Sequence, residues 1–482
     1  MSGPEPAASF ARRAARGEVS IEESVAKTLE ECEKTDSRLA CFNTICGEPA
    51  LSRARALDGL AKEGKAAGRL FGVPVSVKDN ICTKGVRTTA GSAIISDYVP
   101  PMSATAVERI EAEGGIVVGK TAMDEFGFGG FCVNVGKGFR VPRNPLDEKR
   151  VTGGSSGGCG AVTAALAAAG IPHASLAEST GGSITSPACF CGVVGITPTY
   201  GRVSRWGLID FASSLDKIGS IGANVEDAAL LLEAAQGADA RDMTSRPEPA
   251  GPLADAARGL GKRFRLGVPK EFFEGVDPRV SDLVWGAVKK LEAEGSEVGE
   301  VSLPTAKYAV PAYYLIAVSE ASTNLARFNG TRFGLQREPE QAFGEYFSEI
   351  RAEGFGDEAK RRVILGTFAR MAGYRGKYYL RAMKVRTRII AEFARAFEKY
   401  DALVAPSMPI LPPTFEEVSG LAPHEAYALD LCTTPPNIAG IPHASVPAGM
   451  AGGLPAGAQV MCAHLQERRV VEVASALEAV SK

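Results

Sequence analysis

Two glycine-framed serine motifs and an upstream lysine are the residues of this chain best suited to chemistry. The motifs are residues 153–158, GGSSGG, and residues 179–183, STGGS, and the lysine is Lys78. A serine hydroxyl becomes a good nucleophile only when a neighbouring group takes its proton. The chain has four histidines, none of them in a motif typical of a catalytic base. A serine hydrolase built from these motifs would therefore use the lysine as its base, provided that the amine is neutral.

The second motif could hold both the nucleophile and the groups that stabilise the reaction intermediate. Glycines allow successive backbone N–H groups to point into one concavity, which suits a developing oxyanion. We expect Ser183 to be the nucleophile and the N–H groups of Thr180, Gly181 and Gly182 to form the oxyanion hole. The first motif precedes an alanine-rich segment that predicts a helix, and Ser155 near its start could relay the proton of Ser183 to the lysine.

The alternative is that both motifs are turns or flexible loops, as glycine- and serine-rich runs usually are. Two features favour chemistry. The motifs flank one predicted helix, and Lys78 ends an apolar segment, residues 71–78, that predicts a buried strand. A lysine at the end of a buried strand is unusual unless it is paired or functional. The residues alone leave a Ser/Lys hydrolase and a pair of loops as open alternatives.

Residues 153–198 resemble the signature of the amidase signature family, including GGSI at 181–184 and FCGVVG at 190–195. The resemblance implies a Ser–cis-Ser–Lys triad with Lys78 as base, Ser155 as the bridging serine on a cis peptide bond, and Ser183 as nucleophile. It also implies an α/β fold with a central mixed β-sheet flanked by helices. Most members carry Asp where this chain has Ser179, so the support of the nucleophile loop is expected to differ.

Within this family, the chain most resembles the A subunits of tRNA-dependent amidotransferases. The segments FASSLD at 211–216 and DLCTTP at 430–435 carry this resemblance. It implies a glutaminase that supplies ammonia for amidation of Glu-tRNA(Gln), Asp-tRNA(Asn) or both. Arg362 would bind the carboxylate of glutamine and Asp430 its ammonium group, with Tyr313 assisting. Without the resemblance, Arg362 would be interpreted as an exposed helix residue.

The same resemblance implies partners. A heterotrimer with B and C subunits is expected, in which the partner holds ATP, Mg²⁺ and the aminoacyl-tRNA while this chain binds glutamine and needs no cofactor. The net charge of −2 fits that division, because it offers no basic surface for RNA. Residues 114–121, GGIVVGKT, satisfy a phosphate-loop pattern, but Ile116, Val117 and Val118 prefer an extended backbone, so we interpret this segment as a buried strand. The sequence does not decide between Gln-tRNA and Asn-tRNA as the product.

Composition indicates the size of the core and which kinds of site and segment the chain can contain. The chain has 482 residues, 45% of them hydrophobic, which supports a sizeable core. Ten cysteines occur without a C-x-x-C motif or a histidine cluster, which favours reduced thiols in the cytoplasm and no metal site. Cys189 and Cys191 lie two residues apart in an apolar run, which predicts one face of a strand. No apolar stretch reaches about 18 residues, so we expect no membrane span.

The order of predicted elements favours one large α/β domain over residues 1–482. A helical region at 1–70 and another at 305–400 would be parts of it, with returning strands near 443–447 and 457–462. Two other functions stay open beside the glutaminase: a stand-alone amidase for a small or lipid amide, and a catalytically silent scaffold. Arg362 and Asp430 argue against the stand-alone amidase, because an apolar amide needs neither charge. The intact set of Lys78, Ser155 and Ser183 opposes the second.

Overall fold

The computed structural model describes residues 5–249, 251–259, 261–338 and 342–481. In this part of the chain, eleven strands form one mixed sheet in the order β1-β3-β2-β6-β8-β7-β12-β13-β11-β9-β10. The trio β3, β2 and β6 is parallel, as is the trio β11, β9 and β10, and all other pairings are antiparallel. The expected central mixed sheet is confirmed. The strands are β1 (Phe42–Ile45), β2 (Pro74–Lys78), β3 (Ile116–Thr121), β6 (Ala174–Ser179), β7 (Val194–Thr197), β8 (Lys217–Gly222), β9 (Arg265–Pro269), β10 (Glu297–Val301), β11 (Ala402–Pro406), β12 (His443–Ala451) and β13 (Leu454–Met461), with β4 (Arg143–Asn144) and β5 (Asp147–Val151) in a separate hairpin.

Helices cover both faces of this sheet. Gly219 and Gly222 lie three residues apart on β8 and therefore face opposite sides. Ile184, directly before α6, packs at Gly219, whereas Ala228 of α7 packs at Gly222. The helices α4, α7, α16 and α8 contact one another in that order, while α5 contacts α6. These helices are α4 (Thr105–Ala112), α5 (Gly157–Ala168), α6 (Thr185–Cys191), α7 (Val225–Ala235), α8 (Pro278–Ala293) and α16 (Glu467–Ser481).

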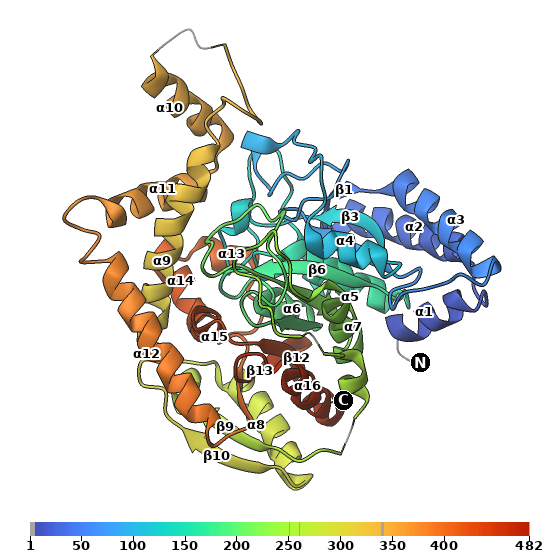
Figure 1. Cartoon of the computed structure of the whole chain (residues 1–482). Coiled ribbons are helices and arrows are strands. Elements are labelled where there is room, and N and C mark those ends of the chain that lie inside the picture. Colours follow the sequence, from blue (N-terminus) through green and yellow to red (C-terminus); the bar gives the residue numbers. More distant parts are fainter. Residues whose placement is uncertain (1–4, 250, 260, 339–341, 482) are drawn as a thin grey trace.

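Two further groups of helices lie at the periphery. One group precedes and flanks β1, and the other forms the opposite side of the molecule, from which α10 projects (Figure 1). Helices were expected in both regions, and the single-domain organisation stays a prediction. The first group is α1 (Ala7–Ala15), α2 (Ile21–Leu39) and α3 (Gly47–Lys62); the second is α9 (Ala309–Asn324), α10 (Phe343–Gly354), α11 (Asp357–Arg370) and α12 (Tyr379–Phe397), with the short α13 (Phe415–Ser419), α14 (Pro423–Ala428) and α15 (Thr434–Ala439) beside it.

The expectation for Cys189 and Cys191 was wrong, because both belong to the helix α6. Pro187 lies in the first turn of α6, where a missing N–H costs nothing, and Gly192 ends the helix with a φ of 68°. Residues two apart on a helix do not share a face. Both thiols are buried, and the chain's ten cysteines are all free.

The segment with the phosphate-loop pattern is the buried strand β3, as expected. Lys120 is fully buried, and its amine donates to the carbonyl oxygen of Ile81 and, at 3.0 Å, to Thr88 Oγ1. Its donors are therefore used inside the protein. Of the helices that the structure describes, none is long and apolar enough to cross a membrane. Within the same residues, no group of three or more His, Cys, Asp or Glu side chains is placed to hold a metal ion.

Candidate active site

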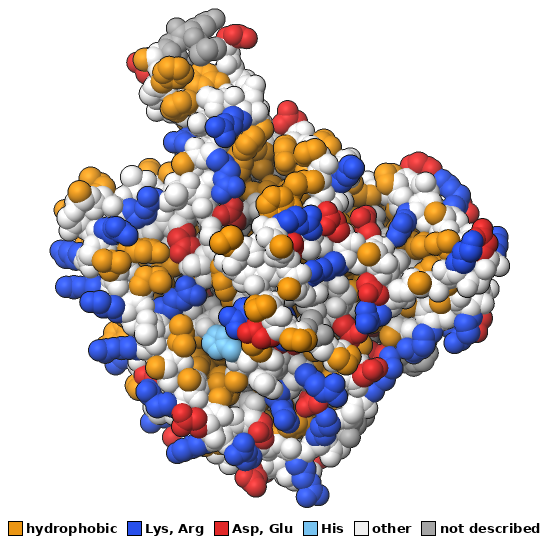
Figure 2. All heavy atoms as spheres, viewed as in Figure 1, with side chains coloured by type: hydrophobic (Ala, Val, Ile, Leu, Met, Phe, Trp, Pro, Cys, Tyr) orange, Lys and Arg blue, Asp and Glu red, His pale blue; other side chains and the backbone are white. Residues whose placement is uncertain are grey.

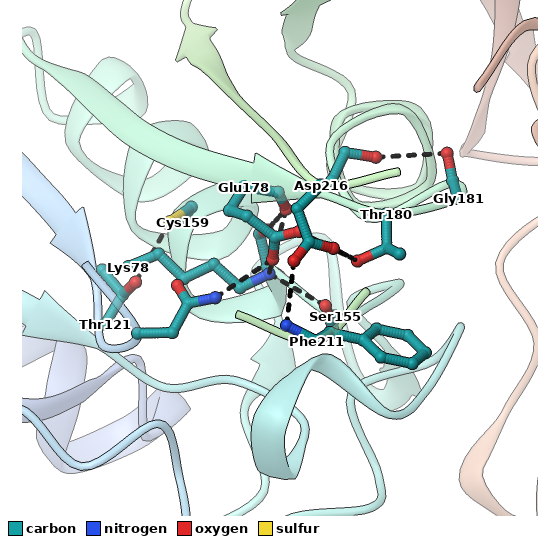
Figure 3. Close-up of polar contacts among 12 residues, drawn as sticks. Lys78, Thr121, Ser155, Cys159, Glu178, Thr180, Gly181, Phe211 and Asp216 are labelled. Carbon is teal, nitrogen blue, oxygen red and sulfur yellow. Dashed lines mark hydrogen bonds and ion pairs between the residues drawn. The ribbon is translucent and has the colours of Figure 1, made fainter. Parts of the chain in front are cut away.

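Lys78 lies at the end of β2, where every residue of the strand is buried. Its side chain has no exposed surface, as the sequence predicted. The amine nitrogen lies within hydrogen-bond distance of three oxygens: Ser155 Oγ at 2.8 Å, the backbone oxygen of Glu178 at 2.9 Å and Glu178 Oε2 at 2.9 Å (Figure 3). The contact with Ser155 suits the last step of the expected proton relay, in which the proton of Ser155 passes to Lys78. The contact with a second carboxyl oxygen was not expected.

The loop that carries Ser155 depends on its glycines. The peptide bond between Gly154 and Ser155 is cis, as expected, and Gly153 has a φ of 77°, which disfavours any residue with a Cβ. A Cβ on Gly154 would collide with the carboxyl group of Asp124. That carboxyl group accepts the N–H groups of Cys132 at 3.0 Å and Asn134 at 2.8 Å, and burial raises the pKa of Asp124 to about 6. Asp124 thus fixes a second loop beside the Ser155 peptide.

Ser183 lies in the loop that follows β6 and is 5% exposed. The N–H group of Ser156 donates to its backbone oxygen at 3.2 Å, which ties the two serine motifs together. Among the described residues, no hydrogen bond joins the hydroxyl of Ser155 to that of Ser183. The structure therefore brings Lys78 and Ser155 into direct contact and places Ser183 in the neighbouring loop.

Close packing explains why two glycines precede Ser183. A Cβ on Gly181 would lie 2.8 Å from the hydroxyl oxygen of Tyr313, and one on Gly182 would lie 2.7 Å from Thr433 Oγ1. Both distances are too short for a real Cβ, so the loop can approach these side chains only as glycine. The amide of Asn437 donates to the backbone oxygen of Thr180 and holds the start of the loop. The role of the N–H groups of Thr180, Gly181 and Gly182 as an oxyanion hole stays a prediction.

Ser179 stands where the family resemblance implies Asp, and its hydroxyl donates to the backbone oxygen of Gly181 at 3.1 Å. A carboxyl group is nevertheless present, because Glu178 points its side chain toward Lys78. The hydroxyl of Thr180 lies 2.9 Å from Glu178 Oε1 and 2.7 Å from Asp216 Oδ1 (Figure 3). Burial, and then the charge of Glu178, raise the pKa of Asp216 well above its usual range.

Arg362 comes from α11 and is only 2% exposed, so the interpretation as an exposed helix residue is wrong. Its guanidinium Nε donates to Glu358 Oε1 at 2.8 Å, one helical turn earlier. Aromatic rings surround the guanidinium at 5.2 to 5.4 Å from its central carbon, which is favourable cation–π geometry. The rings belong to Phe128, Phe211, Tyr314 and Tyr427.

Asp430 is 9% exposed and accepts a hydrogen bond from the hydroxyl of Tyr314 at 2.6 Å. Burial raises the pKa of Asp430 to about 6, with Tyr314 and Arg362 opposing the rise. The expected neighbour Tyr313 packs edge-on against Tyr314, with ring centroids 5.0 Å apart, and touches Gly181 instead. Arg362, Asp430 and the two tyrosines are therefore brought together as expected, but Tyr314 is the residue that contacts Asp430.

A cavity of about 140 Å³ lies beside this group, lined by Gly130, Tyr314, Glu358, Arg362 and Tyr427 among others. The backbone oxygen of Gly130 accepts the N–H group of Gly154 at 2.8 Å, and a Cβ on Gly130 would lie 3.3 Å from Asp430 Oδ1. Gly130 thus connects the cavity to the loop of the bridging serine. Larger hollows elsewhere on the surface lie away from Lys78 and Ser183.

Sequence reasoning missed four residues of this site: Glu178, Tyr314, Glu358 and Tyr427. Glu358 had a signal, because a glutamate four residues before an arginine on a helix predicts an ion pair. Glu178 had a weaker one, since it directly precedes the nucleophile motif. Nothing in the sequence links Tyr427 to α11.

Comparisons with known proteins agree with this geometry. The family model described as Amidase matches residues 23–471. A curated protein of Moorella thermoacetica, the A subunit of a glutamyl-tRNA(Gln) amidotransferase, is 46% identical over 96% of this chain and 94% of its own. The crystal structure of the protein of the same name from Thermotoga maritima has a TM-score of 0.75 and 34% identity, covering 96% of this chain and 94% of that one.

A second solved chain is closer in shape and more distant in sequence. It is described as part of a vestigial protein complex that reveals the evolutionary origins of an s-triazine catabolic enzyme. Its TM-score is 0.85 and its identity 29%, covering 98% of both chains. Since the family model spans nearly the whole sequence and the Moorella protein is 46% identical over 96% of it, this chain belongs to the amidase family.

Proposed function

We propose that this chain is the glutamine-hydrolysing A subunit of a glutamyl-tRNA(Gln) amidotransferase. The observation that carries its chemistry is the fully buried Lys78 amine, 2.8 Å from the hydroxyl of Ser155, beside the loop of Ser183. The identity of 46% to a protein of that name supports the specific assignment.

The proposed reaction uses Ser183 as nucleophile. As its oxygen attacks the side-chain amide carbon of glutamine, its proton passes to Ser155, and the proton of Ser155 passes to neutral Lys78. The N–H groups of residues 180–182 would stabilise the negative charge that develops on the amide oxygen. The relay then returns a proton to the leaving nitrogen, and ammonia departs. Water hydrolyses the glutamyl–serine ester, which releases glutamate and restores Ser183.

Arg362 and Asp430 supply the charges that an amino-acid substrate requires. In this proposal, the guanidinium of Arg362 binds the α-carboxylate and Asp430 binds the α-ammonium group. The pKa of Asp430, about 6, leaves its carboxyl group mostly ionised at neutral pH, so it can pair with an ammonium group. Glu358 holds Arg362 from the side, and the substrate carboxylate would share the guanidinium with it.

Partners follow from the chemistry and from the surface. The proposed assembly contains a B subunit that uses ATP and Mg²⁺ to activate Glu-tRNA(Gln) or Asp-tRNA(Asn), together with a C subunit, in the cytoplasm. Apolar and basic side chains lie beside one another over the region of α11 and α12 (Figure 2), which supports a docking face on these helices. The exposed apolar residues there are Ile364, Leu365, Phe368, Met371 and Leu380.

A stand-alone amidase is the second candidate, favoured by one observation. The chain resembles in shape a peptide amidase of Stenotrophomonas maltophilia, with a TM-score of 0.81, more than the Thermotoga protein, with 0.75. Sequence identity orders the two the other way, 27% against 34%. The buried charges of Arg362 and Asp430 favour an amino-acid substrate over a neutral amide.

The decisive experiment is to purify this chain with its native B and C subunits and to measure glutamate release with and without Glu-tRNA(Gln) and ATP. We expect tRNA-dependent glutaminase activity, a loss of at least about 10³-fold in Ser183→Ala and Lys78→Ala, and intact amidation from free ammonia in both variants. Rapid hydrolysis of simple amides by the isolated chain, without glutaminase activity, would establish the stand-alone amidase instead.

A further inference from the structure

When Lys78 accepts the proton of Ser155, it becomes a buried ammonium ion that needs a stabilising partner. Its side chain is fully buried, and a buried ammonium ion without a partner is costly. Glu178 Oε2 lies 2.9 Å from the amine, and Glu178 is itself 1% exposed. The same oxygen accepts the side-chain amide of Asn80 at 3.1 Å, which fixes the carboxyl group in place.

We propose that Glu178 is a positioning residue for the lysine base. It holds the amine of Lys78 against Ser155 and stabilises the ammonium ion formed during attack by Ser183. Its role toward lysine is that of the aspartate toward histidine in a Ser–His–Asp triad. The inference rests on the function proposed above, because it presupposes that Lys78 accepts the proton of Ser155.

The geometry of Thr180 bears on which of two neighbouring carboxyl groups holds a proton. One hydroxyl has one hydrogen, yet Thr180 Oγ1 lies within hydrogen-bond distance of both Glu178 Oε1 and Asp216 Oδ1. One of the two carboxyl groups must therefore supply the second hydrogen. Since burial and the charge of Glu178 raise the pKa of Asp216, we place the proton on Asp216. Asp216 then donates to Thr180, Thr180 donates to Glu178, and Glu178 keeps the charge that faces Lys78.

The proton balance is simple. Ser183 loses its proton to Ser155 as its oxygen bonds to the amide carbon, and Ser155 gives its own proton to Lys78. Lys78 becomes an ammonium ion paired with the carboxylate of Glu178, and no proton leaves the site. When ammonia departs, the proton returns through Ser155 to the leaving nitrogen. Glu178 gains and loses no proton in this sequence.

The test is the pH dependence of glutaminase activity in the complex with the B and C subunits, for wild type and for Glu178→Gln. Glutamine at this position keeps an oxygen for Lys78 but removes the charge that favours the ammonium form. We expect the acid limb of kcat/KM to move to lower pH by about 1–3 units. Because a weaker base takes the serine proton more slowly, we also expect kcat to fall at least about tenfold. KM for glutamine should change less than about twofold, since the carboxyl group of Glu178 contacts Lys78, Asn80 and Thr180 rather than Arg362 or Asp430.

Two further variants separate this role from packing. Glu178→Asp keeps the charge, so its acid limb should stay in place even if kcat falls. Asp79→Asn is the matched control, because Asp79 is a fully buried carboxyl group 4.0 Å from a different lysine, Lys120. Its acid limb should also stay in place. Other titratable groups that interact with the pair are unchanged in every variant: Asp124, Cys132, Cys159, Asp216 and Tyr313.

An unmoved acid limb in Glu178→Gln, whatever happens to kcat, would overturn the proposal and make Glu178 a packing residue. A limb that moves equally in Asp79→Asn would overturn it as well, because any buried carboxyl group would then suffice. Neither result touches the proposed function, which fails only if wild type lacks glutaminase activity or if Ser183→Ala and Lys78→Ala retain it.

Discussion

The proposed catalytic centre and the proposed substrate-binding region of this protein are held in different ways. Lys78 and Glu178 lie at the ends of adjacent parallel strands, and backbone pairing between β2 and β6 fixes their separation. Arg362 and Asp430 come from helical segments outside the sheet, α11 and a short turn at Leu429–Leu431. Their positions depend on side chains, namely Glu358, Tyr314 and the aromatic rings around the guanidinium.

This difference indicates that binding and chemistry can be altered separately. A change at the substrate-binding region removes one side-chain contact while the strands that carry Lys78 and Glu178 keep their register. Such changes should raise KM with little effect on kcat, because they remove binding shared by the ground state and the transition state. Arg362→Ala and Tyr427→Phe test that separation through KM and kcat, whereas Glu125→Gln tests the contact between the two regions through stability.

Arg362→Ala should have the largest effect. It removes the charge-assisted contact proposed for the substrate carboxylate, which is worth about 1.5–3 kcal/mol, so KM for glutamine should rise about 10- to 100-fold. Steady-state glutamate release by the complex measures this. Arg362→Lys is the control, because it keeps the charge and loses the planar fork, and its KM should fall between those of wild type and Arg362→Ala.

Amidation from free ammonia should survive in Arg362→Ala, since ammonia bypasses this site. If ammonia-dependent amidation is lost as well, Arg362 holds the helical region together and its assignment to glutamine is wrong.

Glu125 connects the two regions and gives a test by pH. Its carboxyl group accepts the N–H group of Gly356, directly before α11, at 2.8 Å and the hydroxyl of Ser92 at 2.5 Å. Burial raises the pKa of Glu125 from 4.5 to about 7. The folded protein therefore binds this proton more tightly than the unfolded chain does. Its stability contribution is largest below pH 4.5 and is lost as pH rises to about 7.

Glutamine at this position does not titrate, so Glu125→Gln should not lose this stability as pH rises. The free energy of unfolding of the variant minus that of wild type should therefore increase by about 1–3 kcal/mol from pH 5 to pH 8. Urea unfolding at the two pH values measures it. The control is Glu349→Gln, at an exposed position of α10. Its free energy of unfolding should differ from that of wild type by the same amount at both pH values. If Glu125→Gln also differs from wild type by the same amount at both pH values, the carboxyl group of Glu125 ionises in the folded protein at no cost in stability.

The catalytic centre could be predicted further from the sequence than the substrate-binding region. Lys78 ends an apolar strand and Ser155 lies in a glycine-rich loop before a helix, so local pattern and chemistry indicate the same residues. The contact of Glu178 with Lys78 escaped prediction because it depends on the register of β2 against β6, which no local pattern fixes.

The substrate-binding region was harder to predict because its residues lie far apart along the chain. Tyr313 and Tyr314 are neighbours on α9, and only the orientation of that helix decides that Tyr314 contacts Asp430. The error at Cys189 and Cys191 has a local cause. A short apolar run suits a buried helix as well as a strand, and Pro187 and Gly192 decide for the helix.

Tyr427→Phe should have the smallest effect and is the sharpest test of how Arg362 is held. The ring of Tyr427 stacks on that of Tyr314, with centroids 4.1 Å apart, and lies 5.4 Å from the central carbon of Arg362. Its hydroxyl donates to Glu358 Oε1, the oxygen that Arg362 also contacts. Phenylalanine keeps the ring and removes only the hydroxyl. Glu358 then draws more strongly on Arg362 and competes better with the substrate carboxylate.

KM for glutamine in Tyr427→Phe should therefore rise by no more than about threefold, with kcat unchanged, because one hydrogen bond contributes about 0.5–1.5 kcal/mol and only part of it reaches the substrate. Tyr427→Ala, which also removes the stacked ring, should raise KM further. An increase in Tyr427→Phe as large as that of Arg362→Ala would mean that the hydroxyl contacts glutamine directly. Specificity would then reside on α14 as much as on α11.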